Sequence, residues 1–158
     1  MLPPDPLSPT AVLPTDLLGE WLLRRSVVDR LAGVTGDVTG TTTLTLTAPD
    51  EVWWDETGTM RLGDRETPVS RRLSVRRGPD GRWTVHFADG RVFHDWVWGT
   101  PVEHACAPDD YTGVLAGDAE RWTVRWEARG PAKDHRLDSV LERHRPVSVL
   151  GRRGTAAD

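Results

Sequence analysis

The stretch DVTGTTTLTLT, residues 37–47, decides the fold, because its residue types alternate at every second position. One set of alternate positions holds apolar and small residues: Val38, Gly40, Thr42, Leu44 and Leu46. The other set holds Asp37 and five threonines. Successive side chains of a β-strand point to opposite faces, and β-branched residues favour strands. The stretch therefore predicts a strand with one face on a core and the other in solvent.

The same alternation continues on both sides of this stretch, interrupted at short intervals by Gly, Pro or Asp. We expect strands at 20–30, 37–47, 51–62, 67–77, 83–88, 91–98, 102–117, 120–130 and 134–144, with a bulge or break at Pro108. Sequential strands with short turns predict an all-β, up-and-down antiparallel barrel of nine or ten strands, and a two-sheet sandwich is the alternative. One helical turn is expected at PTDLLGE, capped by Thr15 or Asp16 and ended by Gly19.

A hairpin is predicted at VHFADGRVFHDW, residues 85–96. If Asp89 and Gly90 are the central residues of a type I′ turn, Val85 pairs with His94 and Phe87 pairs with Val92. This register places His94 and Val92 inside the barrel and His86 outside. A longer loop would slip the register and exchange the two histidines.

Length and composition indicate one domain, for which we expect residues 14–146, with a lead-in at 1–13 and a tail at 147–158. The net charge of −4, with no basic stripe, argues against nucleic acid as a partner. The single cysteine allows no internal disulfide, and no apolar run is long enough for a membrane helix. The sequence therefore predicts a reduced, cytoplasmic protein without membrane contact, as a monomer or homodimer.

Several charged side chains share the inward face with tryptophans. An unpaired charge inside a protein costs several kcal/mol, so these groups pair with one another, meet water or hold a ligand. The functional hypothesis is a pocket for a small, anionic, partly apolar or aromatic molecule clamped by Arg25 and Arg71. The candidate binding residues are Arg25, Trp54, Glu56, Arg71, Trp83, His94, Trp96, His104, Tyr111 and Trp126. The alternative is a filled polar interior without a ligand, in which Arg25 pairs with Glu56, and Arg71 with Asp29 or Asp109.

The histidines leave a second functional alternative open, a small-molecule enzyme with His94 or His104 as acid and base and Tyr111 as proton donor. The alternative is a purely structural role, with His94 buried and hydrogen-bonded to Glu56 or Tyr111 and Cys106 a buried, inert thiol. His104 and Cys106 supply only two ligands, so no zinc site is predicted. No cofactor is expected, although a haem held by one histidine remains an alternative.

The stretch LLGEWLLRR, residues 17–25, together with Arg143 or Arg145, resembles the lipocalin and calycin barrels. The resemblance implies that Trp21 closes the barrel floor and that one of these arginines packs across it. Four motifs are more closely similar to a family of lipocalin-like domains of unknown function: G-x-W-x-L-x-R at 19–25, D-G-R-x-F-H at 89–94, H-x-C-x-x-D-x-Y at 104–111 and G-P-x-K-D at 130–134. This resemblance implies a fold and no reaction. Leu73 and Val75 replace larger expected aromatics, which predicts a wider cavity.

Overall fold

The computed structural model describes residues 11–145, and these form ten antiparallel strands and one short 3₁₀ turn. The turn, η1, spans Pro14–Leu17. The strands are β1 (Gly19–Asp29), β2 (Val34–Ala48), β3 (Glu51–Leu62), β4 (Arg65–Arg77), β5 (Trp83–Phe87), β6 (Val92–Asp95), β7 (Val102–Cys106), β8 (Asp109–Gly117), β9 (Arg121–Gly130) and β10 (Lys133–Arg143). The prediction of an all-β fold with a short N-terminal helical turn is confirmed.

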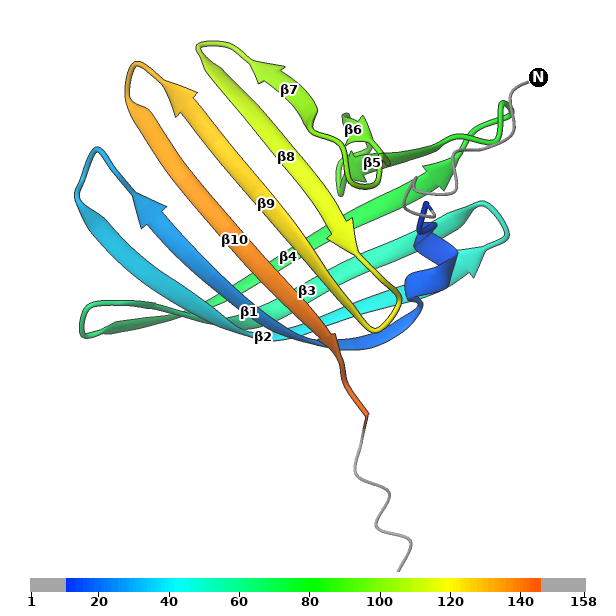
Figure 1. Ribbon diagram of the computed structural model, residues 1–158, viewed down its shortest axis with the longest axis horizontal. Coiled ribbons are helices and arrows are strands. Elements are labelled where there is room, and N and C mark those ends of the chain that lie inside the picture. Colours follow the sequence, from blue (N-terminus) through cyan, green and yellow to red (C-terminus); the bar gives the residue numbers. More distant parts are fainter. Residues whose placement is uncertain (1–10, 146–158) are drawn as a thin grey trace, which may run out of the picture.

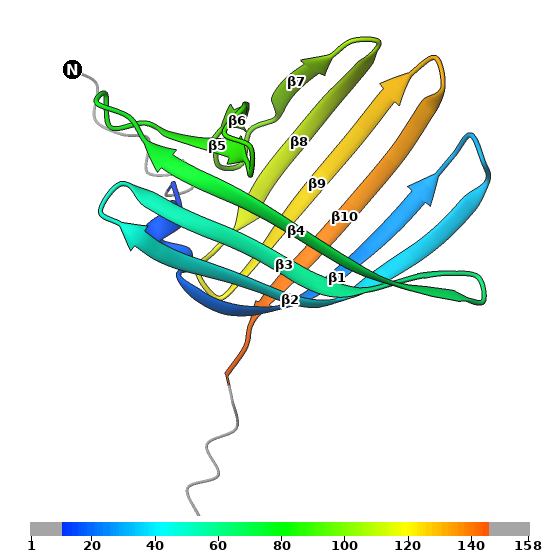
Figure 2. The ribbon, with the colours of Figure 1, turned by 180° about the vertical axis from the view of Figure 1, so that it is seen from behind.

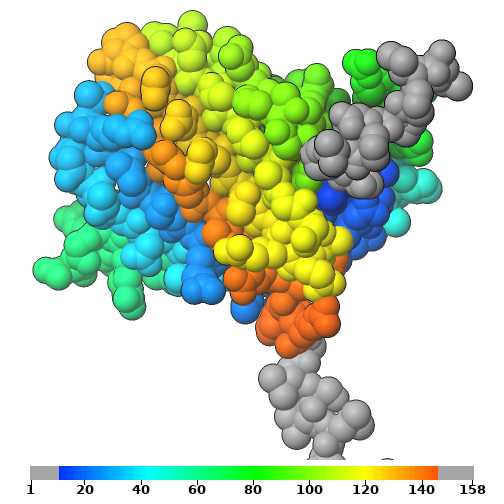
Figure 3. Space-filling view, in the orientation of Figure 1, coloured from blue at the N-terminus to red at the C-terminus, as the bar shows by residue number. Residues whose placement is uncertain are grey.

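One sheet contains all ten strands, in the order β6-β5-β4-β3-β2-β1-β10-β9-β8-β7. Every hydrogen-bonded neighbour is antiparallel, and β1 pairs with both β2 and β10. The sheet curls until its two edges, β6 and β7, approach each other (Figures 1 and 2). Near this seam a parallel bridge joins Trp98 to Leu115. The result is a nearly closed up-and-down barrel, and Figure 3 shows its wall as a continuous surface over β1, β10, β9 and β8.

The predicted strand at 102–117 is two strands joined by a tight turn at Ala107 and Pro108. Cys106 pairs with Asp109, and His104 pairs with Tyr111. The break expected at Pro108 is therefore a hairpin turn, which brings the count to ten strands. The proposed domain limits stay a prediction, because residues 1–10 of the lead-in and the whole tail at 147–158 lie outside the described residues.

The β5–β6 turn differs from the predicted type I′ turn. Gly90 N donates to Phe87 O at 2.9 Å, so the tight turn centres on Ala88 and Asp89. A type I′ turn at Asp89 would require a positive φ there, and among the described residues only glycines have one. The Asp89 carboxylate accepts from Arg91 N at 3.0 Å and from Arg91 Nε at 2.7 Å, which stabilises this turn.

A bulge at Phe93 compensates for the longer turn. His86 pairs with Val92, and Val85 pairs with His94, so Phe93 is one extra residue in β6. The two shifts cancel, and His94 lies inside the barrel opposite Val85 as the sequence predicted. Val92 was predicted to face inward, but its exposed fraction is 57%, so that placement is wrong. Phe93 turns inward in its place.

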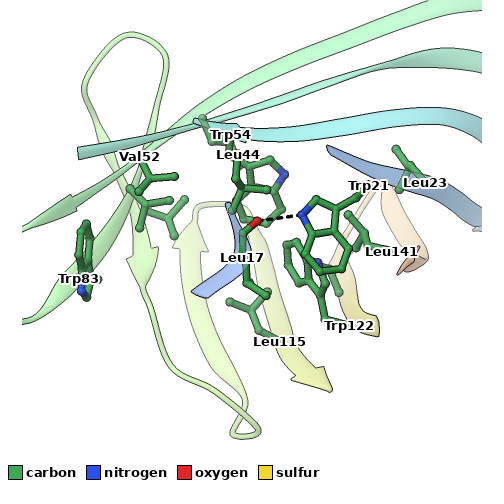
Figure 4. Close-up of a cluster of buried hydrophobic side chains, with 14 of the residues drawn as sticks. Leu17, Trp21, Leu23, Leu44, Val52, Trp54, Trp83, Leu115, Trp122 and Leu141 are labelled. Atoms are coloured by element: carbon green, nitrogen blue, oxygen red, sulfur yellow. Dashed lines mark hydrogen bonds between the residues drawn. The ribbon is translucent and has the colours of Figure 1, made fainter. Parts of the chain in front are cut away.

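The closed end of the barrel is a floor of tryptophans over η1. Trp21 and Trp122 are fully buried, and their ring centroids lie 6.0 Å apart at an edge-to-face angle of 85°. Trp21 Nε1 donates to Leu17 O at 2.8 Å, which ties the floor to η1 (Figure 4). Asp16 was one of the two residues expected at the N-cap position, but the N-cap residue is Leu13 and Asp16 is the third residue of η1. The Asp16 carboxylate accepts from Leu13 N at 2.9 Å. Burying these large rings stabilises the floor.

Arg143 is the arginine that packs across the floor, as the resemblance implied for Arg143 or Arg145. Its guanidinium carbon lies 4.4 Å from the centroid of the Trp21 ring. It donates to Leu18 O at 2.8 Å, to Ala119 O at 2.9 Å and to Asp16 O at 3.2 Å. Arg143 therefore holds the last strand, η1 and the β8–β9 turn together.

We predict that Arg143→Met lowers the free energy of unfolding by about 2–4 kcal/mol, because three carbonyl groups lose a charged donor and Trp21 loses its cation. Urea unfolding followed by circular dichroism measures this. Arg145→Met is the matched control, since the Arg145 side chain is 73% exposed and, among residues 11–145, pairs with the exposed Glu120 alone. That control should stay within about 0.5 kcal/mol of the parent protein. Equal stability of the two variants would contradict the role given to Arg143.

Candidate functional site

A cavity of about 330 Å³ lies toward the end of the barrel where β9 passes into β10, away from η1. Residues from seven of the strands and from the β5–β6 turn line it. They are Arg71, Phe87, Arg91, Phe93, His104, Cys106, Tyr111, Trp126, Ala128, His135 and Leu137. The cavity is therefore bounded by aromatic and aliphatic side chains with a few basic and polar groups among them.

Three aromatic rings form one wall of this cavity. The Phe87 and Phe93 rings are stacked with centroids 4.5 Å apart and an interplanar angle of 12°. Phe93 also stacks on Trp126, at 4.7 Å and 24°. Gly113 makes room for Trp126, because a Cβ at that glycine would lie 2.6 Å from the indole ring. The three stacked rings form a continuous aromatic column along the wall, against which an apolar or aromatic ring could pack.

A buried carboxylate shared by two arginines forms the layer beneath the cavity. Glu56 Oε1 accepts from Arg25 Nη2 at 2.8 Å and from Arg71 Nη2 at 3.0 Å, while Thr42 Oγ1 donates to Glu56 Oε2 at 3.2 Å. Arg25 Nε donates to Ser139 Oγ at 2.7 Å. Burial acts to raise the pKa of Glu56, but the Arg71 and Arg25 guanidiniums outweigh it and hold that pKa below its usual value. Glu56 is therefore ionised, and the group of three charges carries a net charge of +1.

Arg71 is the member of this group that reaches the cavity. Its side chain is 34% exposed and lines the cavity, whereas the Arg25 side chain is 15% exposed and does not. Within residues 11–145, Arg71 Nε is buried and has no hydrogen-bond partner. The excess positive charge of the group makes this part of the cavity favourable for an anion.

His94 lies behind the aromatic wall. It is 5% exposed, and its ring centroid is 4.8 Å from that of Phe93 and 5.1 Å from that of Trp126. Its Nδ1 lies 2.7 Å from Asp95 O, so its partner is a backbone carbonyl rather than Glu56 or Tyr111. Burial lowers the pKa of His94, and the nearby His104 and Arg71 act in the same direction. His94 is thus a neutral, supporting side chain at neutral pH.

The polar groups of the cavity come mainly from β7, β8 and β10. His104 lies edge-on to Phe93 at 5.3 Å, and His135 Nε2 lies 3.3 Å from Asp29 Oδ2. Lys133 Nζ donates to Tyr111 OH at 3.0 Å. It also lies 3.2 Å from Asp109 Oδ2, so Asp29 and Asp109 bind these partners and not Arg71.

The thiol of Cys106 was expected to be buried, but Cys106 is exposed at the cavity, because it ends β7 at the tip of the hairpin. Within residues 11–145, no three His, Cys, Asp or Glu side chains are grouped as a metal site requires. No helix in that part of the chain is long and apolar enough to span a membrane.

The structure brings together four of the ten candidate binding residues at the cavity: Arg71, His104, Tyr111 and Trp126. Arg25, Glu56 and His94 lie beside or beneath it. The other three candidates, Trp54, Trp83 and Trp96, pack in the core away from the cavity. The parity of the strands placed these residues on the inward face but carried no information on their height along the barrel.

Seven cavity residues were absent from the candidate binding residues: Phe87, Arg91, Phe93, Cys106, Ala128, His135 and Leu137. The sequence contained a signal for His135, since it lies two positions before Leu137 on the same strand face. Phe93 left no such signal, because only the bulge turns it inward.

Comparison with known proteins gives a family match and structural neighbours. A family model described as "Family of unknown function (DUF6314)" matches residues 17–143. No curated protein sequence matches the chain. The S-type phycobiliprotein lyase CPES of Guillardia theta is similar in structure, with a TM-score of 0.62 at 11% identity, over 84% of this chain and 90% of that chain. At this identity the similarity supports the fold alone.

Two further structures have lower scores. A redesigned β-barrel, mFAP0, solved with DFHBI bound, has a TM-score of 0.44 at 15% identity, over 81% of this chain and 99% of that chain. A protein of unknown function from the DUF3598 family of Nostoc punctiforme has a TM-score of 0.42 at 14% identity, over 88% of this chain and 53% of that chain.

We predict that Glu56→Gln lowers the free energy of unfolding by about 3–5 kcal/mol, because two guanidiniums lose their shared countercharge in a buried layer. Asp55→Asn is the matched control on the same strand, since Asp55 pairs with the 55% exposed Arg72 on the outer face. The control should lose no more than about 1 kcal/mol. Chemical denaturation of both variants measures the difference, and a small loss for Glu56→Gln would contradict a buried charge network.

We predict that stability falls as the pH drops from about 7 to about 5, where His residues titrate and most carboxylates remain ionised. The unfolded chain takes up a proton at residue 94 in this range, whereas folded His94 resists it because its pKa is lowered. The folded state then binds fewer protons than the unfolded state. The free energy of unfolding therefore falls on acidification, by up to about 1.4 kcal/mol per pH unit. Denaturation curves of His94→Gln should show a flatter pH dependence than those of His86→Gln, the control on the same hairpin.

Proposed function

The chain belongs to this family of unknown function, DUF6314, and we propose that it is a small-molecule-binding barrel. The observation that carries the proposal is the aromatic cavity of about 330 Å³ directly above a charge group with a net positive charge. Its volume falls within the range of about 300–1,000 Å³ that is usual for ligand pockets. A mostly apolar wall with a few converging polar groups is the usual composition of such sites.

The ligand that fits this geometry is a flat, partly apolar molecule with one anionic group. Its ring would pack against the stack of Phe87, Phe93 and Trp126, and its carboxylate or phosphate would lie beside the guanidinium of Arg71, which lines the cavity. Arg25 takes a different role, because its donors go to Glu56 and Ser139. Arg25 therefore positions Glu56 and does not clamp the ligand. The proposed binding needs no cofactor.

The contents of the barrel weigh against the alternative of a filled interior. The Glu56 group fills the middle layer, as that alternative expects, and pairs Arg25 with Glu56. Above this layer the cavity is not filled by protein side chains, and four candidate binding residues line it. The filled layer and the binding cavity thus occupy different heights of the same barrel.

An enzyme acting on a small molecule is the second candidate, favoured by one observation. His104 and Tyr111 face each other across the β7–β8 pair, and Lys133 donates to the Tyr111 hydroxyl at the cavity rim. A histidine and a tyrosine with a lysine beside it could together move a proton. Conversion of a bound compound, lost in Tyr111→Phe with binding retained, would distinguish this candidate from a carrier.

We predict that 8-anilinonaphthalene-1-sulfonate, an aromatic anion with a flat naphthalene ring, binds the folded protein at one saturable site, measured by its fluorescence on titration. Arg71→Gln should weaken this binding at least about tenfold, because a hydrogen bond to a charged group contributes about 1.5–3 kcal/mol. The neutral analogue N-phenyl-1-naphthylamine should bind parent and variant with similar affinity.

Arg72→Gln is the matched control for the anion contact. Arg72 is adjacent in sequence, but it faces outward, where it pairs with Asp55 and covers Trp53 at 4.5 Å. The Arg72→Gln variant should bind both probes with the affinity of the parent protein. Near-ultraviolet circular dichroism checks that each variant keeps native packing. An unchanged affinity of Arg71→Gln for the sulfonate would exclude Arg71 as the anion contact, and no saturable binding of either probe would refute the pocket.

A further inference from the structure

A second cleft, of about 290 Å³, lies beside the start of β5 and the segment after β6. Three tryptophans line it, Trp83, Trp96 and Trp98, and residues 11–13 form one edge. It shares no lining residue with the ligand cavity. Inferences about this cleft therefore do not depend on the proposed function.

One tryptophan of the cleft, Trp96, already binds a short piece of extended backbone. Trp96 and Trp98 are stacked, with ring centroids 5.9 Å apart and an interplanar angle of 26°. Trp96 Nε1 donates to Val12 O at 2.8 Å. The next residue, Leu13, has φ −90° and ψ 157°, and Pro14 follows it. These angles lie near those of a polyproline II helix.

An aromatic groove whose side chains contact an extended, proline-containing backbone is a known mode of peptide recognition. Such a backbone is stiff before it binds, so little conformational entropy is lost on docking. Flat rings pack well against prolines, and an indole N–H can supply the hydrogen bond that a free carbonyl of the segment needs. The hydrogen bond from Trp96 to Val12 is one contact of this kind. The rest of the cleft has space for a longer extended segment.

The chain itself supplies a segment of matching chemistry at the right place. The described residues begin at Ala11, which lines the cleft. The ten residues before it are MLPPDPLSPT, with four prolines at positions 3, 4, 6 and 9. An extended segment of this size spans about 31 Å at about 3.1 Å per residue. Because it is covalently attached at the cleft edge, its effective concentration there is high.

We propose that the cleft of Trp83, Trp96 and Trp98 is a polyproline-binding groove and that its occupant is the chain's own segment 3–9. The docked segment would continue the path of residues 11–13 across the start of the β5–β6 hairpin. This hairpin forms one edge of the open seam of the barrel. Docking therefore ties the N-terminal segment to one edge of that seam.

The test uses a nitroxide spin label at Asp5→Cys in the full chain, in a Cys106→Ser background because the exposed Cys106 would also take the label. Indole N–H signals are recorded by ¹H–¹⁵N NMR with the nitroxide oxidised and then reduced. We expect the signals of Trp96 and Trp98 to lose most of their intensity in the oxidised state, while the signal of the floor residue Trp21 persists. A label at Asp64→Cys, in the β3–β4 turn, is the matched control and should leave Trp96 and Trp98 unchanged.

Three outcomes would overturn the proposal. Equal intensities of the Trp96 and Trp98 signals in both states would mean that the segment does not dock there. Loss of these signals in a mixture of ¹⁵N-labelled protein without nitroxide and unlabelled protein with nitroxide would make a second copy the occupant. If the Trp96 and Trp98 signals still lost intensity after replacement of Pro3, Pro4, Pro6 and Pro9 by alanine, the segment would dock without requiring its prolines.

Discussion

The rest of the structure depends on one interaction, the pairing of the buried Glu56 carboxylate with both Arg25 and Arg71 inside the barrel. The Arg25 guanidinium is largely and the Arg71 guanidinium partly withdrawn from water, and one buried carboxylate supplies the countercharge for both. This layer separates a floor sealed by tryptophans from a cavity that is not filled. Because one positive charge is left over, the side of the layer that faces the cavity favours an anion.

The distribution of the aromatic residues follows from this layering. Trp21, Trp54 and Trp122 pack at the closed end, where their large rings exclude water from η1 and from the ends of β1 and β10. At the other end the stacked rings of Phe93 and Trp126 lie along the wall of the open cavity. The same fold thus buries three indoles at the floor, keeps Trp126 for the cavity and places Trp83, Trp96 and Trp98 at the second cleft.

The β5–β6 hairpin contributes to both ends of the molecule. Its start carries Trp83, and the segment that follows it carries Trp96, which together line the second cleft. Its tip carries Phe87 and Phe93, which line the ligand cavity. A hairpin at the edge of a sheet has neighbours on one side only, so contacts at its two ends decide where it lies.

The sequence by itself determined that sequential strands form an all-β barrel and which faces of the long strands turn inward, because a side-chain period of two is a local property of an extended chain. It left the pairing of Arg25 with Glu56 as one of two alternatives, which the structure decided. Only the tertiary structure decided that Phe93 faces inward, that Arg71 also binds Glu56, and that Trp54, Trp83 and Trp96 lie away from the cavity. A bulge changes which face a residue occupies, and the height of a side chain in a barrel depends on the stagger between distant strands. The alternation of residues along one strand predicts neither the position of a bulge nor the stagger between strands.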